Sequence, residues 1–172
     1  IRRQRQMCIR DSNKSIRKYK MKILVTGGTG LVGHALNSIS DTYAPTEFIF
    51  AGSKNCDLTR IDETVDYVRD CQPDAIIHLA AVIGSIDFGS KRPATMLRDN
   101  VFMNMNVLEA ARLNNIRKTV MTLSTGMYPG DAPVPIKEEY IHQGYPHDSS
   151  YAYAFAKRLV DPSIRAYRTQ YG

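Results

Sequence analysis

The sequence predicts an α/β fold: a doubly wound parallel sheet with helices packed against it. Short apolar runs alternate with longer amphipathic stretches from Met21 onward, a pattern typical of successive βαβ units. The chain of 172 residues is 43% hydrophobic and 23% charged, so it can build one soluble domain around one core. The chain has no internal repeat.

The first five elements are expected in regular alternation. A strand at residues 22–26 precedes a helix at 31–40, and a second strand at 47–51 precedes a helix at 61–71. A third strand is expected at 74–79. Each strand is a short apolar run, whereas each helix spaces its apolar residues three or four positions apart.

The pattern then becomes less regular. A long helix at 94–114 and a strand at 119–123 precede residues 125–150, whose four prolines and three glycines predict an irregular loop with a binding or lid role. A helix follows at 151–171, kinked at Pro162 because proline lacks a backbone N–H donor. Since another strand is expected after this helix, we expect the fold to be truncated before its last strands and a substrate domain.

The positive charge is concentrated at the start of the chain. Residues 1–20 hold eight Lys or Arg and one acidic residue, whereas residues 21–172 carry a net charge of −1, against +6 for the whole chain. We interpret residues 1–20 as a disordered, non-native leader, with a genuine basic tail as the alternative, and residues 21–172 as one incomplete domain. The near-neutral body argues against a nucleic-acid partner.

Targeting and metal signals are missing from the sequence. Neither a signal-peptide apolar region nor an apolar stretch of 18 residues occurs, so we expect a cytoplasmic protein without a membrane partner. The three cysteines and four histidines are scattered without metal-ligand spacing, so we expect reduced thiols and no metal.

A glycine-rich turn joins the first strand to the first helix. The run from Thr26 to Gly33 satisfies GxGxxG in the strand-turn-helix context that the motif requires. Its glycines permit a tight turn, close approach of a pyrophosphate and close helix packing, while free N–H groups at the helix start bind phosphate. The motif predicts a Rossmann-like dinucleotide site, a plain glycine-rich turn being the alternative. The expected contacts are Gly27, Gly28, Gly30, Leu31, Val32 and Gly33.

The end of the second strand favours NADP over NAD. An acidic residue about 20 residues past the glycine turn would bind the ribose 2′-hydroxyl of NAD, and this sequence has none there. Ser53 and Lys54 instead offer a hydroxyl and a cation that suit the 2′-phosphate of NADP. Alternatively, Lys54 is an ordinary surface lysine and the 2′ position is recognised elsewhere.

Three residues form a candidate catalytic group. Tyr153 and Lys157 are four residues apart on a predicted helix, so the ammonium can lower the phenol pKa and hold a cofactor ribose. Ser124 follows the fourth strand, at the sheet edge where ligands bind, and can hydrogen-bond the same substrate oxygen as Tyr153. The Tyr-Lys spacing alone is too common to prove a site.

Together these motifs resemble the extended short-chain dehydrogenase/reductase family, and within it the GDP-L-fucose synthases. The more specific stretches are His78–Gly84, Leu123–Thr125 with Tyr128–Pro129, and Pro135–Glu139 with His142–Gly144. The resemblance implies an NADPH-dependent enzyme that epimerises GDP-4-keto-6-deoxy-D-mannose at C3 and C5 and then reduces its C4 ketone.

The same resemblance assigns roles to individual residues. It makes Tyr153 the proton donor to the C4 oxygen, Lys157 its partner that also binds the cofactor ribose, and Ser124 the second ligand of that oxygen. It also implies a homodimer that pairs the helix at 94–114 with the helix from Tyr151. Further implied cofactor contacts are Asp57, Leu58, Leu79, Ala80, Ala81 and Asn100, although Asn100 is almost as well explained as a polar residue near a helix start.

The sequence departs from this family at Gly126. The family has a cysteine there that moves protons during epimerisation with a downstream histidine, which would lie beyond Gly172; His142 and His147 are poor substitutes. Three hypotheses follow: a GDP-L-fucose synthase, a GDP-4-keto-6-deoxyhexose 4-reductase without epimerase activity, or a catalytically dead dinucleotide-binding module. Without a substrate domain, we expect the chain itself to be inactive.

Overall fold

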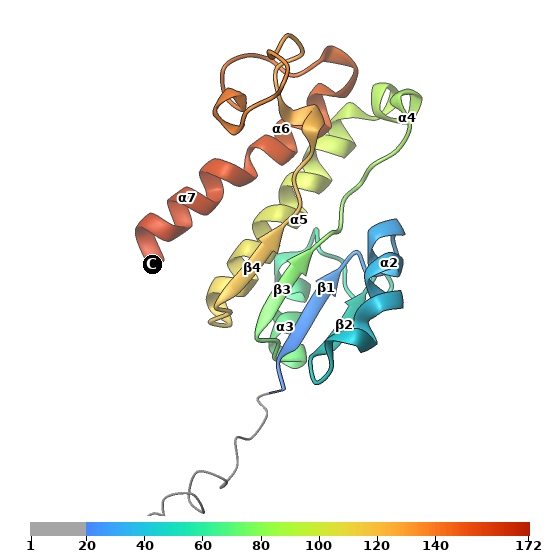
Figure 1. Ribbon diagram of the computed structural model, residues 1–172, viewed down its shortest axis with the longest axis vertical. Helices are drawn as coiled ribbons and strands as arrows, with labels where there is room; N and C mark the ends of the chain where they lie inside the picture. The colour runs from blue at the N-terminus through green and yellow to red at the C-terminus, as the bar shows by residue number, and fades with distance from the viewer. Residues whose placement is uncertain (1–19) are drawn as a thin grey trace, which may run out of the picture.

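The computed structural model describes residues 20–172 (Figure 1). The predicted leader at residues 1–20 lies outside this part except for Lys20, whose ammonium lies 2.8 Å from a carboxylate oxygen of Glu47. In the part described, no helix is both long and apolar enough to cross a membrane.

A single parallel sheet forms the centre of the fold. Its strands are β1 (Lys22–Thr26), β2 (Glu47–Ala51), β3 (Ala75–His78) and β4 (Lys118–Met121). They lie in the order β2-β1-β3-β4, which confirms the predicted α/β class. The register pairs Thr26 with Ala51 on one side and with His78 on the other, so the carboxyl ends of three strands meet at one edge. Because the strand order reverses between β1 and β3, this edge is where ligands bind in such sheets.

Within residues 20–172, six α-helices connect and cover these strands. They are α2 (Leu31–Ile39), α3 (Ile61–Cys71), α4 (Ile86–Lys91), α5 (Pro93–Leu113), α6 (Tyr151–Arg158) and α7 (Val160–Tyr171). The sequence pattern did not predict α4. This helix has only six residues, which is too short to show a helical period in the sequence. The expected interruption of the last helix is confirmed: α6 and α7 separate at Leu159, and Pro162 has no N–H to offer the carbonyl of Arg158.

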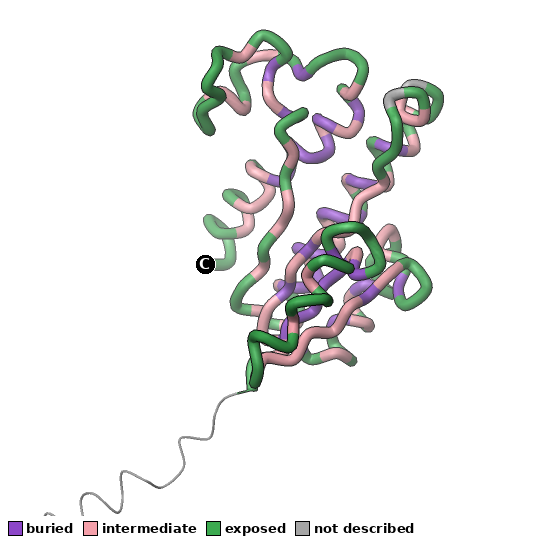
Figure 2. The backbone as a smooth tube through the Cα atoms, turned by 45° about the vertical axis from the view of Figure 1, so that its right-hand side comes forward, coloured by how far each residue is buried: buried purple, intermediate pink, exposed green. Residues whose placement is uncertain are grey.

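The hydrophobic core lies between the sheet and the helices α3 and α5. Leu24 and Ile76 of the two central strands are fully buried against Val68 of α3 and Val107 of α5. Figure 2 shows this buried zone in the lower half of the molecule, continuing upward along α5. A 21-residue α5 therefore joins the core to the segments above the sheet.

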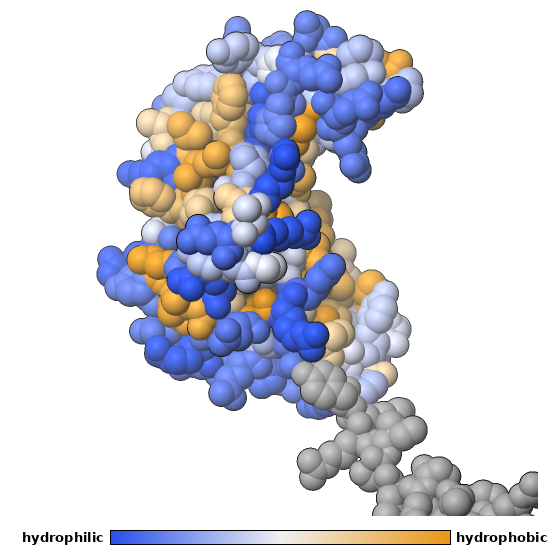
Figure 3. All heavy atoms as spheres, turned by 90° about the vertical axis from the view of Figure 1, so that its left-hand side faces the viewer, coloured by the Kyte–Doolittle hydropathy of each residue, from blue (hydrophilic) through white to orange (hydrophobic). Residues whose placement is uncertain are grey.

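The segment between β4 and α6 lies beyond the carboxyl ends of the strands, at the top of Figure 1. It holds three short 3-10 helices, η2 (Thr125–Met127), η3 (Glu138–Tyr140) and η4 (Asp148–Ser150), and is otherwise irregular, as predicted. On the side turned forward in Figure 3, apolar side chains lie in patches among polar ones. Both β4 and α7 carry exposed apolar residues, among them Val120 of β4 and Tyr171 of α7.

Candidate active site

The glycine turn is held tightly against the ends of β2 and β3. Gly27 has a φ of +71°, and a Cβ added there would lie 2.6 Å from the backbone nitrogen of Ala80. The N–H of Gly28 donates to the carbonyl of Ala51 at 2.8 Å. The left-handed turn is thus made by Gly27, the residue before the first glycine of the motif. The whole turn is fixed before any ligand binds.

The start of α2 presents free backbone donors. A Cβ on Gly33 would lie 2.5 Å from the carbonyl carbon and oxygen of Gly28, so the first turn of the helix touches the loop directly. Gly30 caps the helix without a side-chain hydrogen bond, and Leu31 and Val32 are exposed. Uncapped N–H groups at a helix start, with no Cβ in front of them, can bind a pyrophosphate.

The turn after β2 lies beside the glycine loop. A Cβ on Gly52 would lie 2.7 Å from Oγ1 of Thr29, which joins the two turns. The Asn55 side chain accepts from the N–H of Gly52 at 2.9 Å and closes this turn. Ser53 and Lys54 are exposed on it, so the structure brings the predicted 2′-phosphate ligands to the mouth of the glycine loop.

The next loop carries Asp57 and Leu58, two of the cofactor contacts that the family resemblance implies. Asp57 is exposed, and its carboxylate accepts from the backbone and the hydroxyl of Thr59, which lowers the pKa of Asp57. The carbonyl of Leu58 accepts from the Asn106 amide of α5 at 2.9 Å. The contact with α5 holds the loop in place, and the Asp57 side chain remains on the surface.

The segment after β3 is hydrogen-bonded to the end of β1 and to α5. The N–H of Leu79 donates to the carbonyl of Thr26 at 3.0 Å, and Ala80 and Ala81 follow beside Gly27. Asn100 bonds both backbone groups of Val82, at 3.0 and 2.8 Å, and also donates to the carbonyl of Met96. Because its amide is fully used, Asn100 acts on a cofactor only indirectly, by holding this segment.

Ser124 and Tyr153 meet above the carboxyl end of β4. The Ser124 hydroxyl lies near enough to Tyr153 to act on the pKa of the phenol, and the Ser124 oxygen accepts from the N–H of Gly126 at 3.2 Å. Ser124 precedes η2, whereas Tyr153 lies in the first turn and a half of α6. The structure therefore brings the two predicted ligands of one substrate oxygen together from segments 29 residues apart.

Lys157 is almost completely buried, with 1% of its surface exposed. Its ammonium donates to the carbonyl of Thr122 at 3.1 Å and lies 6.0 Å from the centre of the Tyr153 ring. The expectation that Lys157 lowers the phenol pKa is not met in this structure. Burial raises the pKa of Tyr153, and the interaction with Ser124 acts in the opposite direction.

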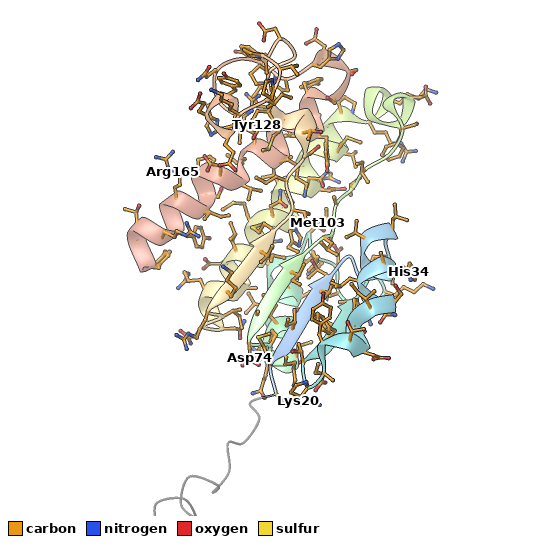
Figure 4. The ribbon with its side chains drawn as sticks, viewed as in Figure 1. Lys20, His34, Asp74, Met103, Tyr128 and Arg165 are labelled. Carbon is orange, nitrogen blue, oxygen red and sulfur yellow. The ribbon has the colours of Figure 1, made fainter. Side chains whose placement is uncertain are left out.

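Arg158 fastens the irregular loop to α6. Its guanidinium donates to the carbonyl of Met127, just after Ser124, and to the carbonyl of Gly144 at 2.7 Å. It also lies over the Phe155 ring, 5.3 Å from its centre. Figure 4 shows Tyr128, the residue after Met127, within this loop above the sheet. Burial lowers the pKa of Arg158.

Sequence reasoning overlooked Arg158 and a set of buried polar residues beneath the site. The buried residues are Thr26, His78 and Asn104, and the half-buried Thr122 is hydrogen-bonded to His78. A signal was available for Asn104, because it follows Asn100 by four positions on the helix face that also holds Met96 and Val107. Asn104 has 3% of its surface exposed, and a polar residue in a buried helical stripe needs a specific partner.

The arrangement as a whole combines a dinucleotide cradle with a serine-tyrosine pair and a buried lysine at one sheet edge. Such a site can bind a dinucleotide and deliver a proton to an oxygen held by Ser124 and Tyr153. Among the residues described, no cluster of three or more metal-ligating side chains occurs.

A family model described as the NAD dependent epimerase/dehydratase family matches residues 23–172. The chain belongs to this family.

Curated relatives refine this family membership. A probable GDP-L-fucose synthase of Drosophila melanogaster is 41% identical over 153 residues, and a GDP-L-fucose synthase of Dictyostelium discoideum is 38% identical over 155 residues. A GDP-L-colitose synthase of Yersinia pseudotuberculosis is 37% identical over 138 residues. The alignments cover 88%, 89% and 80% of this chain but only 48%, 48% and 44% of the relatives. The chain thus spans about half the length of these proteins, and the resemblance inferred from its motifs is confirmed.

Solved structures of this family have the same architecture. The NADP-bound GDP-L-fucose synthetase from Naegleria fowleri superposes with a TM-score of 0.79 at 38% identity, covering 87% of this chain and 45% of that one. A GDP-6-OMe-4-keto-L-xylo-heptose reductase from C. jejuni superposes with a TM-score of 0.82 at 26% identity, covering 89% and 44%. Family members with this half-fold therefore include a synthetase and a reductase of GDP-linked sugars.

Proposed function

We propose that the protein is an NADPH-dependent epimerase and reductase that converts GDP-4-keto-6-deoxy-D-mannose to GDP-L-fucose. The observation that carries this proposal is that Ser124 and Tyr153 lie together beside buried Lys157, next to the glycine turn. The GDP-L-fucose synthase relatives supply the sugar, since the described residues alone do not identify it. The chain itself, at about half the length of these relatives, is proposed to be inactive.

The cofactor proposal rests on the fit of residues around the glycine turn. The pyrophosphate is assigned to the N–H groups at the start of α2, where an added side chain at Gly33 would collide with the backbone of Gly28. The 2′-phosphate is assigned to Ser53 and Lys54, with no carboxylate at the end of β2 to repel it. NADPH, when bound, supplies the hydride for reduction of the C4 ketone.

The chain's own residues supply the proton and the orientation. Tyr153 donates its phenolic proton to the C4 oxygen, and Ser124 binds the same oxygen through its hydroxyl. Lys157 binds the cofactor ribose with the ammonium donors that the Thr122 carbonyl does not use. The raised pKa of Tyr153 keeps the phenol protonated, as a proton donor requires.

A second candidate, a 4-reductase without epimerase activity, is favoured by Gly126. A Cβ added there would have as its nearest atoms the hydroxyl oxygens of Ser124, at 3.6 Å, and Ser150, at 4.0 Å. A side chain at this position would therefore face the catalytic serine without a clash. Glycine has no group that can move a proton, so epimerisation would need another residue.

Product analysis separates these two candidates. The full-length gene product, incubated with NADPH and GDP-4-keto-6-deoxy-D-mannose, is expected to form GDP-L-fucose. GDP-linked 6-deoxyhexose with unchanged configuration at C3 and C5 would instead identify the reductase, and Gly126→Cys would then test whether one side chain restores epimerisation. An absence of sugar-dependent NADPH oxidation would favour the dead module.

The assembly and location are also proposals. Pairing of α5 and α6 across a two-fold axis would give a homodimer, and exposed apolar residues on these helices include Phe102 and Tyr151. Sedimentation of the full-length gene product would test this pairing. We propose a cytoplasmic location, because nucleotide sugars and NADPH are both available there.

A further inference from the structure

A path of hydrogen bonds leads away from the Lys157 ammonium and returns to its backbone. The Thr122 carbonyl accepts from Lys157 Nζ at 3.1 Å, and the Thr122 hydroxyl donates to the carbonyl of His78 at 3.0 Å. The His78 ring Nε2 lies 3.2 Å from Oδ1 of Asn104. The Asn104 amide nitrogen donates to the carbonyl of Ala156 at 3.2 Å. Because Ala156 precedes Lys157, the path is closed, and we name these five residues the buried circuit.

The direction of each bond in the buried circuit is determined by its partners. The Ala156 carbonyl can only accept, so the Asn104 amide must turn its nitrogen toward α6 and its oxygen toward His78. His78 must then donate from Nε2. Its Nδ1 is left as an acceptor for the Thr26 hydroxyl, which lies 2.7 Å away. The surroundings therefore specify one neutral tautomer of His78.

We propose that Asn104 and His78 are positioning residues that hold Lys157 for the cofactor ribose through the buried circuit. This inference rests on the proposed NADPH-binding function. His78 fixes the ammonium through Thr122 on one side and fixes the helix that carries Lys157 through Asn104 on the other. Both ends of the lysine side chain are thereby tied to the end of β3, directly beside the glycine turn.

Burial and charge support a positioning role. Among the ion pairs of the described residues, none includes Lys157, and its ammonium donates to the backbone carbonyl of Thr122. His78 and Asn104 are also buried, with 0% and 3% of their surfaces exposed. Burial and the nearby Lys157 charge both lower the pKa of His78, which keeps a second positive charge away from the ammonium. No buried polar side-chain atom of the described residues lacks a partner.

Loss of Asn104 should release α6 locally. Asn104→Leu removes the donor to Ala156 and the acceptor for His78 while filling a similar volume. The ammonium of Lys157 would then no longer be aligned with the ribose beside the nicotinamide. The adenosine end of the cofactor, whose 2′-phosphate is assigned to Ser53 and Lys54 after β2, should be unaffected because β1 lies between β2 and β3.

The test compares two ligands on the 172-residue chain by fluorescence or calorimetric titration. NADPH contains the nicotinamide ribose, whereas adenosine 2′,5′-bisphosphate contains only the adenosine end. Asn104→Leu is expected to weaken NADPH binding about 5-fold to 10-fold and to change adenosine 2′,5′-bisphosphate binding less than twofold. The matched control is Asn114→Leu, since Asn114 also donates from α5 to backbone carbonyls, of Val65 and Ala110, at the far end of the helix.

Two results would overturn the proposal: equal weakening of both ligands by Asn104→Leu, or NADPH binding within twofold of the parent. If circular dichroism shows that this variant does not fold, the pair His78→Gln and His78→Leu decides. Glutamine can offer an N–H to Asn104 and should retain NADPH affinity, whereas leucine should lose it. Equal losses in this pair would also contradict the role.

A separate readout distinguishes failure of this inference from failure of the proposed function. If the parent chain binds neither ligand, the proposed cofactor site is wrong, and the buried circuit is judged by ¹⁵N NMR of the His78 ring. The circuit requires the neutral form protonated on Nε2 at pH 7. A ring protonated on Nδ1, or on both nitrogens, would overturn it whatever the cofactor.

Discussion

The ammonium of Lys157 lies 6.0 Å from the ring centre of Tyr153, one turn away on α6, and donates to the carbonyl of Thr122. The two side chains share one helix face, as their spacing predicted, with the ammonium over the Tyr153 ring. One backbone carbonyl uses only one of the three ammonium donors. The others are available to a ribose hydroxyl, so the structure leaves the lysine ready for a ligand that also approaches Tyr153.

Removal of the Tyr153 hydroxyl should stop reduction without preventing cofactor binding. We expect Tyr153→Phe to lower the rate of sugar-dependent NADPH oxidation about 1000-fold, since general acid catalysis contributes about 10² to 10⁴. The matched control is Tyr151→Phe, because Tyr151 lies two residues earlier on α6 and is exposed. Stopped-flow absorbance of the full-length gene product measures the rate. A Tyr153→Phe enzyme within tenfold of the parent would contradict the assignment.

Stability should fall as the pH drops through the mildly acidic range, because of His78. Its folded pKa is lowered from 6.5 to about 4, chiefly by burial and then by the charge of Lys157. The unfolded chain therefore binds a proton that the folded chain excludes. His78 costs no stability above pH 6.5, and its cost grows as the pH falls toward 4. From pH 7 to pH 5 we expect a loss of about 2 kcal/mol.

Urea unfolding of the parent and of His78→Gln at both pH values measures this loss. The glutamine variant cannot titrate, so its free energy of unfolding should change less between pH 7 and pH 5. Carboxylates with lowered pKa values, such as Glu109, act in the same direction but mainly below this window. Equal pH dependence in the two proteins would show that His78 does not titrate as the structure implies.

A methyl group at Gly33 should disrupt the cofactor turn. The added Cβ would lie 2.5 Å from backbone atoms of Gly28, which cannot move without shifting the whole loop. We expect Gly33→Ala to cost about 3 kcal/mol in the free energy of unfolding and to abolish NADPH binding. Gly89→Ala is the control, since its Cβ would meet only the flexible end of Met96, at 3.5 Å. An NADPH affinity of Gly33→Ala equal to that of the control would be inconsistent with this packing.

Arg158 should be needed for the loop above the site. Replacing it by methionine leaves the carbonyls of Met127 and Gly144 without their charged donor, and we expect a cost of about 3 kcal/mol. Arg165→Met provides the comparison, because Arg165 is exposed on α7 and points away from the fold in Figure 4. Thermal unfolding measures both variants, and a similar melting temperature for the two would argue against the anchoring role.

Local patterns were sufficient to predict the strands, the long helices and several residues that the structure brings to the carboxyl edge of the sheet. The glycine turn, Ser53–Lys54 and the Tyr153–Lys157 pair are each encoded within a few neighbouring residues, so their positions could be read from spacing. The prediction that α6 and α7 separate also followed from one proline. These features depend on local backbone chemistry, which a single sequence contains.

Features that join distant segments could not be predicted in the same way. The Asn104 contact with Ala156 spans 52 residues and the Arg158 contact with Met127 spans 31. Their side chains look like ordinary polar positions on helices until tertiary packing buries them. The pKa shift of Tyr153 was expected in the wrong direction for the same reason, since its burial depends on the tertiary packing of α6 and not on the neighbouring lysine alone.

The most direct test of the account is a titration of the 172-residue chain with NADPH and with NADH, after circular dichroism has shown that it is folded. Binding should be at least tenfold tighter for NADPH, and Lys54→Ala should remove most of that preference while leaving NADH affinity unchanged. Equal affinity for the two cofactors, or a preference for NADH, in the folded chain would contradict the assignment of the turn after β2 as the 2′-phosphate site.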